Sequence, residues 1–259
     1  MIYSTRALAL TAGERPPLVG VERRHGQDVS FMTARAGHLL QTLSATATVM
    51  PATTRAAEQL HRVMLPGHPH HFMVAANGGL LFVDGHLDVP WNRRVRRRLA
   101  GVASLHEVRT HVGHVSHQPW VRKLRTVADL FLCAEIDPSR MSADWLMQAI
   151  EWAAEGGWRV SVHRRKIYWL PGSLTKGAAV REVADRIGAE MVLAAGDSAL
   201  DVDLLETADQ GMHPRHGDLF GSGWSAPHVN PTPDTGVLAG ENIVEWFLTV
   251  ARERAGAGT

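Results

Sequence analysis

The feature of this sequence that most restricts its fold is the segment 174–209, LTKGAAVREVADRIGAEMVLAAGDSALDVDLLETAD. Its spacing of apolar residues predicts an amphipathic helix over 175–188 and a fully apolar strand over 191–195. The strand ends in Gly196-Asp197-Ser198. In an open α/β sheet, ligands bind at the carboxyl ends of the strands. We therefore expect Asp197 to lie at the ligand-binding edge of such a sheet.

Two further residues of this segment can reach the same edge. Asp201 follows Asp197 at the start of the next helix, and Lys176 precedes it by one helix and one strand. Carboxylates are hard oxygen ligands of the kind that Mg²⁺ accepts together with water and phosphate. A lysine beside them can neutralise a phosphoryl group. The alternative is that the aspartates are a turn residue and a helix cap, with Lys176 in solvent.

The rest of the chain divides into two α/β flanks and a middle part of different pattern. In the first flank the sequence predicts apolar strands over 47–50, 72–76 and 80–83 and a helix over 55–63. This order suggests a parallel sheet. In the middle it predicts an α+β pattern, with helices over 91–103, 105–113 and 142–155 and strands over 130–136, 158–162 and 166–170. We therefore expect a core from residues 1–86 and 172–259 and an inserted domain over 87–171.

The sequence resembles the haloacid dehalogenase-like (HAD) superfamily of phosphotransfer enzymes. The likeness is to its Cof-type, sucrose-phosphatase-like branch, which has a large α/β cap. GDSALD, residues 196–201, resembles the fourth motif of the family, and Lys176 matches the lysine of the third. VAANGG, residues 74–79, resembles a strand end typical of this branch. Thr53-Thr54-Arg55 resembles the second motif, usually Thr-Gly-Arg. Thr33-Ala34-Arg35 is similar but lacks a convincing strand before it, and we expect Thr33 to cap a helix.

The resemblance implies an α/β fold, with a three-layer α/β/α Rossmannoid core and an inserted α+β cap. It implies Mg²⁺-dependent hydrolysis of a small phosphorylated metabolite, with sugar phosphates as a candidate class. Thr53 and Lys176 would hold the transferring phosphoryl group, Asp197 would bind Mg²⁺, and Asp201 would support the metal. The substrate side would be formed by Thr54, Arg55, Asn77 and Gly78.

The first motif of the family, D-x-D-x-T, does not occur in this sequence. Its first aspartate is the nucleophile, which forms an aspartyl phosphate at the tip of the central strand. The first aspartate here is Asp28, after no predicted apolar strand, and the short run Leu18–Val21 is a poor substitute for that strand. Two hypotheses follow. Either the motif lies about five residues before Met1, or the chain is an inactive HAD-like module that binds a phosphorylated ligand or a protein.

Composition limits the remaining classes of function. The net charge of +1 argues against a dedicated nucleic-acid binder, and no apolar stretch is long enough for a membrane span. A single cysteine, Cys133, favours a reducing cytoplasm. The arginines over 93–98 are expected on a solvated helix face, with contact to an anionic substrate as the alternative. The histidines at 68, 70 and 71 are expected in an exposed loop, and His213 and His216 are weaker candidates for the site. The sequence does not indicate an oligomeric state.

Overall fold

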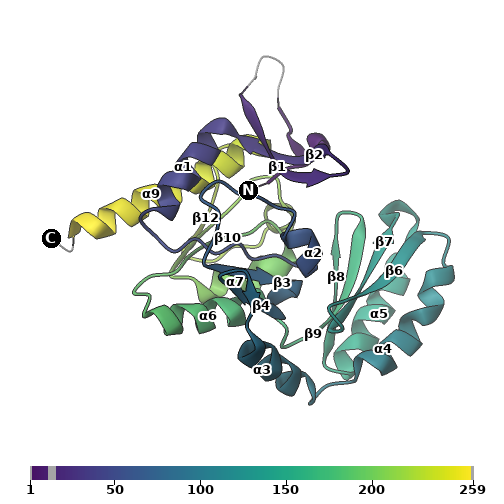
Figure 1. The fold of residues 1–259 in the computed structure, drawn as a ribbon. Coiled ribbons are helices and arrows are strands. Elements are labelled where there is room, and N and C mark those ends of the chain that lie inside the picture. Colours follow the sequence, from purple (N-terminus) through teal and green to yellow (C-terminus); the bar gives the residue numbers. More distant parts are fainter. Residues whose placement is uncertain (1, 11–15, 258–259) are drawn as a thin grey trace.

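The computed structural model describes residues 2–10 and 16–257, and its core sheet is built in two halves (Figure 1). One half is parallel, in the order β10-β11-β12. The other is the antiparallel meander β3-β4-β5, to which Ala52 adds a parallel bridge at Val74. Their bounds are β10 Leu193–Ala195, β11 Gln210–His213, β12 Val229–Pro231, β3 Phe72–Ala75, β4 Leu80–Val83 and β5 His86–Leu87.

Backbone hydrogen bonds show that an open edge of each half lacks a partner strand. Gly196 N–H and the Val192 carbonyl bond to the β11 side, so the backbone groups of the alternate residues, Leu193 and Ala195, point away from it. In the same way the Pro51 carbonyl and the Thr53 N–H bond to Val74. The backbone groups of Met50 and Ala52 therefore point away from β3. No hydrogen bond among the described residues joins these two edges.

Met50 links the two halves of the core. Its side chain packs against the cluster that contains Val74 and also against the cluster that contains Ala194. Residues 47–50, predicted as a strand, are irregular, since a strand needs a partner along its length.

Short helices connect the parallel half of the sheet. The helix α6 (Lys176–Ile187) precedes β10. The carboxyl end of β10 leads into η5 (Ala199–Asp201) and α7 (Val202–Thr207), and that of β11 leads into α8 (Asp218–Gly221). A Cβ at Gly177 would lie 2.4 Å from the Asp203 carbonyl, so α6 and α7 can approach this closely only with glycine there.

The N-terminal hairpin forms a separate sheet that packs on the first and last long helices. The hairpin consists of β1 (Leu18–Arg24) and β2 (Gln27–Thr33), preceded by η1 (Thr5–Ala7), and it packs with α1 (Ala34–Ser44) and α9 (Gly236–Ala257). Thr33 Oγ1 accepts the Ala36 N–H, so its expected role as a helix cap is confirmed. The residues before it, which offer no convincing apolar strand in the sequence, form β2 in the structure.

The cap is a four-stranded antiparallel sheet in the order β6-β7-β9-β8, with α4 and α5 beside it (Figure 1). Trp145 packs edge to face on Trp120 and Trp169, and Cys133 is buried in β7. The bounds are β6 Val121–Val127, β7 Phe131–Ile136, β8 Trp158–His163, β9 Lys166–Pro171, α4 Leu105–Val112, η3 Gly113–His117, η4 Pro138–Arg140 and α5 Ala143–Glu155.

The helix α3 (Val89–Leu99) is anchored to the core although the predicted insertion begins at residue 87. Trp91 Nε1 donates to the Gly78 carbonyl at 2.9 Å, and Arg94 pairs with Glu182 of α6. The helix therefore forms part of the connection between core and cap. The division at 87–171 stays a prediction.

Some elements differ from those predicted. The helix expected over 55–63 is the single turn α2 (Ala57–Leu60), and η2 (Ala76–Gly78) replaces the end of the strand expected over 72–76. The strands β6 and β11 were not predicted, because polar and glycine residues interrupt their apolar pattern. None of the helices in the described part of the chain is long and apolar enough to cross a membrane.

Candidate functional site

A buried ion pair joins the start of α6 to the loop after β10. Lys176 Nζ lies 2.5 Å from Asp201 Oδ1, and the two side chains are only 5% and 9% exposed. The position of Lys176 is set by Thr175, whose Oγ1 accepts the Ala178 N–H and so begins the helix. The structure therefore brings together two of the residues that the sequence placed at one sheet edge.

The second oxygen of Asp201 holds the loop that carries Asp197. Asp201 Oδ2 accepts the backbone N–H groups of Asp197 and Ser198, at 3.2 and 3.1 Å, and the Ser198 hydroxyl at 2.9 Å. Burial by itself would raise the pKa of Asp201, but the Lys176 charge and these hydrogen bonds outweigh it, so the pKa lies below its usual value. Asp201 is thus a carboxylate with both oxygens engaged.

Asp197 lies at the carboxyl end of β10 with an accessible carboxylate. Its side chain is 39% exposed, and Oδ2 lies 3.6 Å from Arg164 Nη2, which comes from the cap. A Cβ at Gly217 would lie 2.5 Å from the Asp197 carbonyl, so a glycine is needed where the next loop crosses it. The exposed carboxylate of Asp197 is therefore open to a cation.

Two ring side chains border Asp197. Tyr3 is buried, which raises the pKa of its hydroxyl, and the nearby Asp197 charge raises it further. His216 has its pKa lowered by burial, although Asp197 acts in the opposite direction. The ring centroids of Tyr3 and His216 are 5.9 Å apart. His216 was a weak candidate from sequence, whereas Tyr3 was missed because no motif marks it.

The Thr53-Thr54 turn is connected to the start of α6 through Asn77. Thr53 Oγ1 accepts the Arg55 N–H at 3.2 Å, and Thr54 Oγ1 donates to Asn77 Oδ1 at 3.2 Å. Asn77 Nδ2 in turn donates to the Leu174 carbonyl at 2.8 Å, two residues before Lys176. This chain of contacts fixes the threonine turn relative to the lysine.

Asn77 and Gly78 hold the backbone around the site. Asn77 is 0% exposed and both ends of its amide are hydrogen-bonded within the protein. Gly78 has a φ of +96°, and a Cβ there would lie 1.9 Å from the Thr175 carbonyl. The substrate contacts that the resemblance implied for these two residues remain a prediction.

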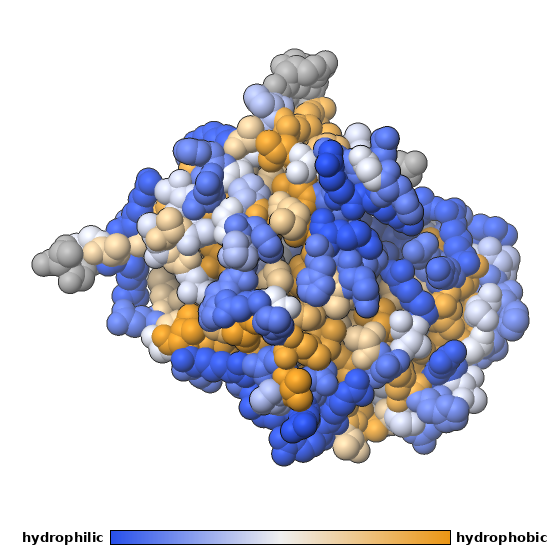
Figure 2. All heavy atoms as spheres, in the orientation of Figure 1, coloured by the Kyte–Doolittle hydropathy of each residue, from blue (hydrophilic) through white to orange (hydrophobic). Residues whose placement is uncertain are grey.

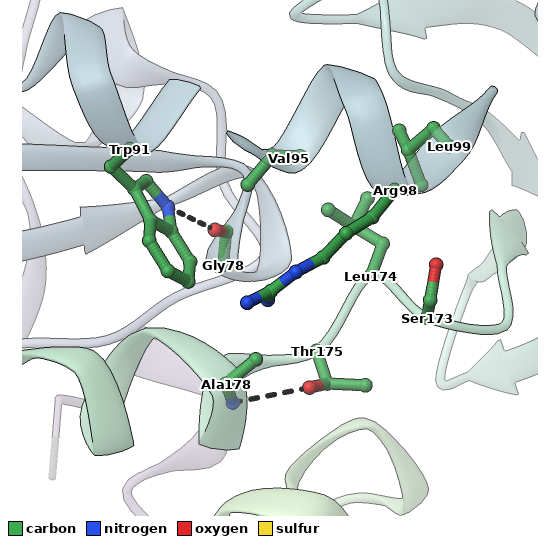
Figure 3. Close-up of a pocket in the computed structure, with 9 residues that line it drawn as sticks. All are labelled: Gly78, Trp91, Val95, Arg98, Leu99, Ser173, Leu174, Thr175 and Ala178. Carbon is green, nitrogen blue, oxygen red and sulfur yellow. Dashed lines mark hydrogen bonds between the residues drawn. The ribbon is translucent and has the colours of Figure 1, made fainter. Parts of the chain in front are cut away.

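A small pocket lies between α3 and the start of α6 (Figure 3). Arg98 extends there near the Trp91 ring, with its Cζ 5.5 Å from the ring centroid. Asp197 does not line it. Since most of the arginines over 93–98 are exposed on α3, the expected solvated helix face describes them well.

The Arg55 side chain points to the N-terminal hairpin. Arg55 Nη1 donates to Glu22 Oε2 at 2.8 Å, and Ser30 and Arg62 complete the surroundings of this buried carboxylate. Burial would raise the pKa of Glu22, but these partners hold it below its usual value. Arg55 therefore ties β1 to the threonine turn, and a direct contact with substrate remains a prediction.

The donor set fits an open magnesium site with one protein carboxylate. Mg²⁺ is commonly held by one or two carboxylates, waters and a substrate phosphate. Asp197 has free oxygens for this role, whereas Asp201 is occupied by Lys176 and the loop. No group of three or more His, Cys, Asp or Glu side chains within residues 2–10 and 16–257 could hold a metal. That includes the histidines at 68, 70 and 71. His68 and His71 are exposed as expected, whereas His70 is buried.

A second acidic and basic pair next to the site was not predicted. Asp203 Oδ2 accepts the Gly177 N–H at 2.7 Å, and its Oδ1 lies 4.0 Å from Arg159 Nη2. Arg159 comes from β8 of the cap and donates to the Leu174 carbonyl at 3.2 Å. The D-x-D spacing of Asp201 and Asp203 was visible in the sequence, but the cap partner was not.

No protein-family model and no curated protein matches this sequence. Solved structures are similar to it. The sucrose-phosphatase from Synechocystis, in complex with sucrose and phosphate, has 16% identity and a TM-score of 0.63, over 82% of this chain and 91% of that one. A haloacid dehalogenase-like hydrolase from B. subtilis has 12% identity and a TM-score of 0.56, over 82% and 92%. A HAD superfamily phosphatase from Bacteroides thetaiotaomicron has 17% identity and a TM-score of 0.52, over 84% and 88%.

Each of these matches covers at least 82% of the chain. At such low identity they establish the fold and leave the activity to be argued from the site. The chain has the fold of the HAD superfamily, with a three-layer α/β/α Rossmannoid core and an inserted α+β cap.

Proposed function

We propose that this protein is a phosphatase-type hydrolase that acts on a small phosphorylated metabolite and depends on Mg²⁺. The observation that carries the proposal is the buried Lys176–Asp201 pair beside the accessible carboxylate of Asp197. The sucrose-phosphatase neighbour, which was solved with sucrose and phosphate, favours sugar phosphates as the substrate class. The single cysteine is consistent with a reaction in the cytoplasm.

In the proposed site each residue acts on the charge of the phosphoryl group. Asp197 would bind Mg²⁺, which supplies Lewis-acid stabilisation when present. Lys176 holds a fixed positive charge at the sheet edge, oriented by Asp201, where negative charge develops on phosphoryl oxygens. Thr53 would donate its hydroxyl to one of these oxygens. The interactions around Asn77 and Gly78 hold the threonine turn and Lys176 in place.

The nucleophile of the proposed reaction would be the first aspartate of a D-x-D-x-T motif, which does not occur in the 259 residues. Its carboxylate oxygen would attack phosphorus, the ester P–O bond would break, and a second acid would protonate the departing oxygen. Water would then cleave the aspartyl phosphate. The backbone edges at Met50–Ala52 and β10 are where a strand that carries such an aspartate would pair. Tyr3 lies near Asp197, so a strand joined before it would end at the carboxyl end of β10.

The second candidate function is an inactive module that binds a phosphorylated ligand or a protein partner. It is favoured by the internal pairing of the charged groups, since Asp197 faces Arg164 and Asp201 faces Lys176. In this case the same residues would hold an anion without transferring it.

Phosphatase assays on two proteins separate these functions. One is the present chain, and the other carries an apolar strand and a D-x-D-x-T motif joined before Met1. We expect hydrolysis of sugar phosphates by the extended protein alone, dependent on Mg²⁺ and abolished by Asp197→Asn. A folded extended protein without activity, which still binds inorganic phosphate, would favour the inactive module.

A further inference from the structure

The tip of the β8–β9 hairpin reaches from the cap to the core site. The tip has the sequence His163-Arg164-Arg165-Lys166, and His163 Nδ1 lies 2.5 Å from Asp218 Oδ2 on the core. The neighbouring Arg164 lies 3.6 Å from Asp197. Figure 2 shows that hydrophilic side chains predominate where this tip meets the core. Two consecutive residues of the cap thus face two different carboxylates of the core.

Turn chemistry does not account for an arginine at position 164. Its φ is +54°, in the left-handed region, which two-residue hairpin turns usually fill with Asn, Asp or Gly. The hairpin pairs His163 with Lys166, and the Arg165 carbonyl accepts the Ile136 N–H at 2.9 Å, so the tip is held firmly by the cap sheet. A strained arginine on a well-held tip indicates a role for its side chain.

A contribution of the Arg164–Asp197 ion pair to stability does not account for the arginine either. The side chains of Arg164 and Asp197 are 49% and 39% exposed, and ion pairs this open contribute little to folding. The guanidinium is also poorly placed for a tight pair, since 3.6 Å is longer than a charge-assisted hydrogen bond. Arg164 therefore lies beside Asp197 without forming a close hydrogen bond to its carboxylate.

We propose that Arg164 is the residue by which the cap binds the phosphoryl group of the ligand. The inference rests on the proposed function, in which Asp197 binds a divalent cation. Once a cation neutralises Asp197, Arg164 loses its counter-ion and its N–H groups turn to the nearest anion. A phosphoryl oxygen bound to that cation is the nearest anion, because metal–oxygen distances are only about 2 Å. The guanidinium fork suits such an oxyanion.

In this role Arg164 has opposite effects on the affinity for the cation and on the affinity for phosphate. The arginine competes with a divalent cation for Asp197, so it weakens binding of the cation alone. It adds a charge-assisted hydrogen bond to phosphate, so it strengthens binding of the anion to the metal-loaded protein. A residue with a purely structural role would not shift the two affinities in opposite directions.

The test uses Mn²⁺, followed by the electron paramagnetic resonance signal of the free ion, and inorganic phosphate added to the Mn²⁺-loaded protein. For Arg164→Gln we expect a Kd for Mn²⁺ about two- to fivefold lower, the range for loss of an exposed charge. We expect its Kd for phosphate to rise at least about fivefold. The matched control, Arg165→Gln, removes an exposed arginine of the same turn and should change both values less than about twofold. Arg164→Lys, which keeps the charge, should keep the Mn²⁺ affinity of the parent protein.

Each outcome separates this inference from the proposed function. If Asp197→Asn abolishes Mn²⁺ binding but Arg164→Gln behaves like Arg165→Gln toward phosphate, the role of Arg164 is overturned and the metal site stands. If Asp197→Asn binds Mn²⁺ as the parent chain does, or the parent binds none, the proposed site itself fails. Matching unfolding curves for the parent and Arg164→Gln exclude a folding defect as the cause of an altered affinity.

Discussion

Replacement of Lys176 by methionine tests the central ion pair of the site. The variant removes the positive charge 2.5 Å from Asp201 Oδ1 and leaves that carboxylate buried, with its side chain 9% exposed. Breaking a buried pair in this way typically costs about 3–5 kcal/mol. The three hydrogen bonds to Oδ2 remain, so we expect a loss near the lower end, about 3 kcal/mol, from a total of about 5–15 kcal/mol.

The loss should depend on pH in a defined direction. In the parent chain the pKa of Asp201 is lowered, so its stabilising effect is present above the usual value of 3.8 and is lost as pH falls below it. Without Lys176, burial is no longer outweighed by the lysine charge and the pKa of Asp201 rises. The variant can then protonate Asp201 at mildly acidic pH. Urea unfolding should therefore show a smaller difference between the two proteins at pH 4.5 than at pH 7.

Two further variants make the interpretation specific. Lys123→Met changes an exposed lysine of β6 and should alter the free energy of unfolding by less than about 0.5 kcal/mol. The double variant Lys176→Met/Asp201→Asn removes both charges but keeps an amide oxygen for the hydrogen bonds from Asp197 and Ser198, and it should recover much of the loss, because no buried charge is left unpaired. A loss below about 1 kcal/mol for Lys176→Met at pH 7, without pH dependence, would contradict the reasoning.

Three other outcomes are expected. Gly78→Ala should destabilise the fold by more than about 2 kcal/mol in urea titration, because strain at positive φ adds to the clash with the Thr175 carbonyl. The control Gly85→Ala, at φ +78° with open space around it, should cost only the strain, about 1 kcal/mol. Glu22→Gln should cost about 1.5–3 kcal/mol at pH 7. That difference should shrink as pH falls below 4.5, since the lowered pKa of Glu22 stabilises the fold only while the carboxylate is charged. Addition of an apolar strand before Met1 should raise the midpoint of thermal unfolding and slow amide exchange in β10, whereas a scrambled polar extension of equal length should change neither.

The fold class and the chemistry of one sheet edge were accessible from the sequence because they depend on local pattern. The helix α6, the strand β10 and the turn at Asp197 follow from apolar periodicity and turn residues within the segment 174–209. Thr33 was recognised as a cap because capping needs only the next three residues. The inserted position of the cap followed from a change in pattern along the chain.

The partners of the site residues were decided by tertiary structure. Arg55 pairs with Glu22 of the hairpin, and Arg164 of the cap faces Asp197, although nothing near any of these residues in sequence marks the contact. Asn77 lies in a motif, but only the fold shows that its amide is used up by Thr54 and Leu174. The physical reason is one of range. Periodicity, caps and turns are set by neighbours a few residues apart, whereas ion pairs and open strand edges depend on which distant segments the packed core brings together.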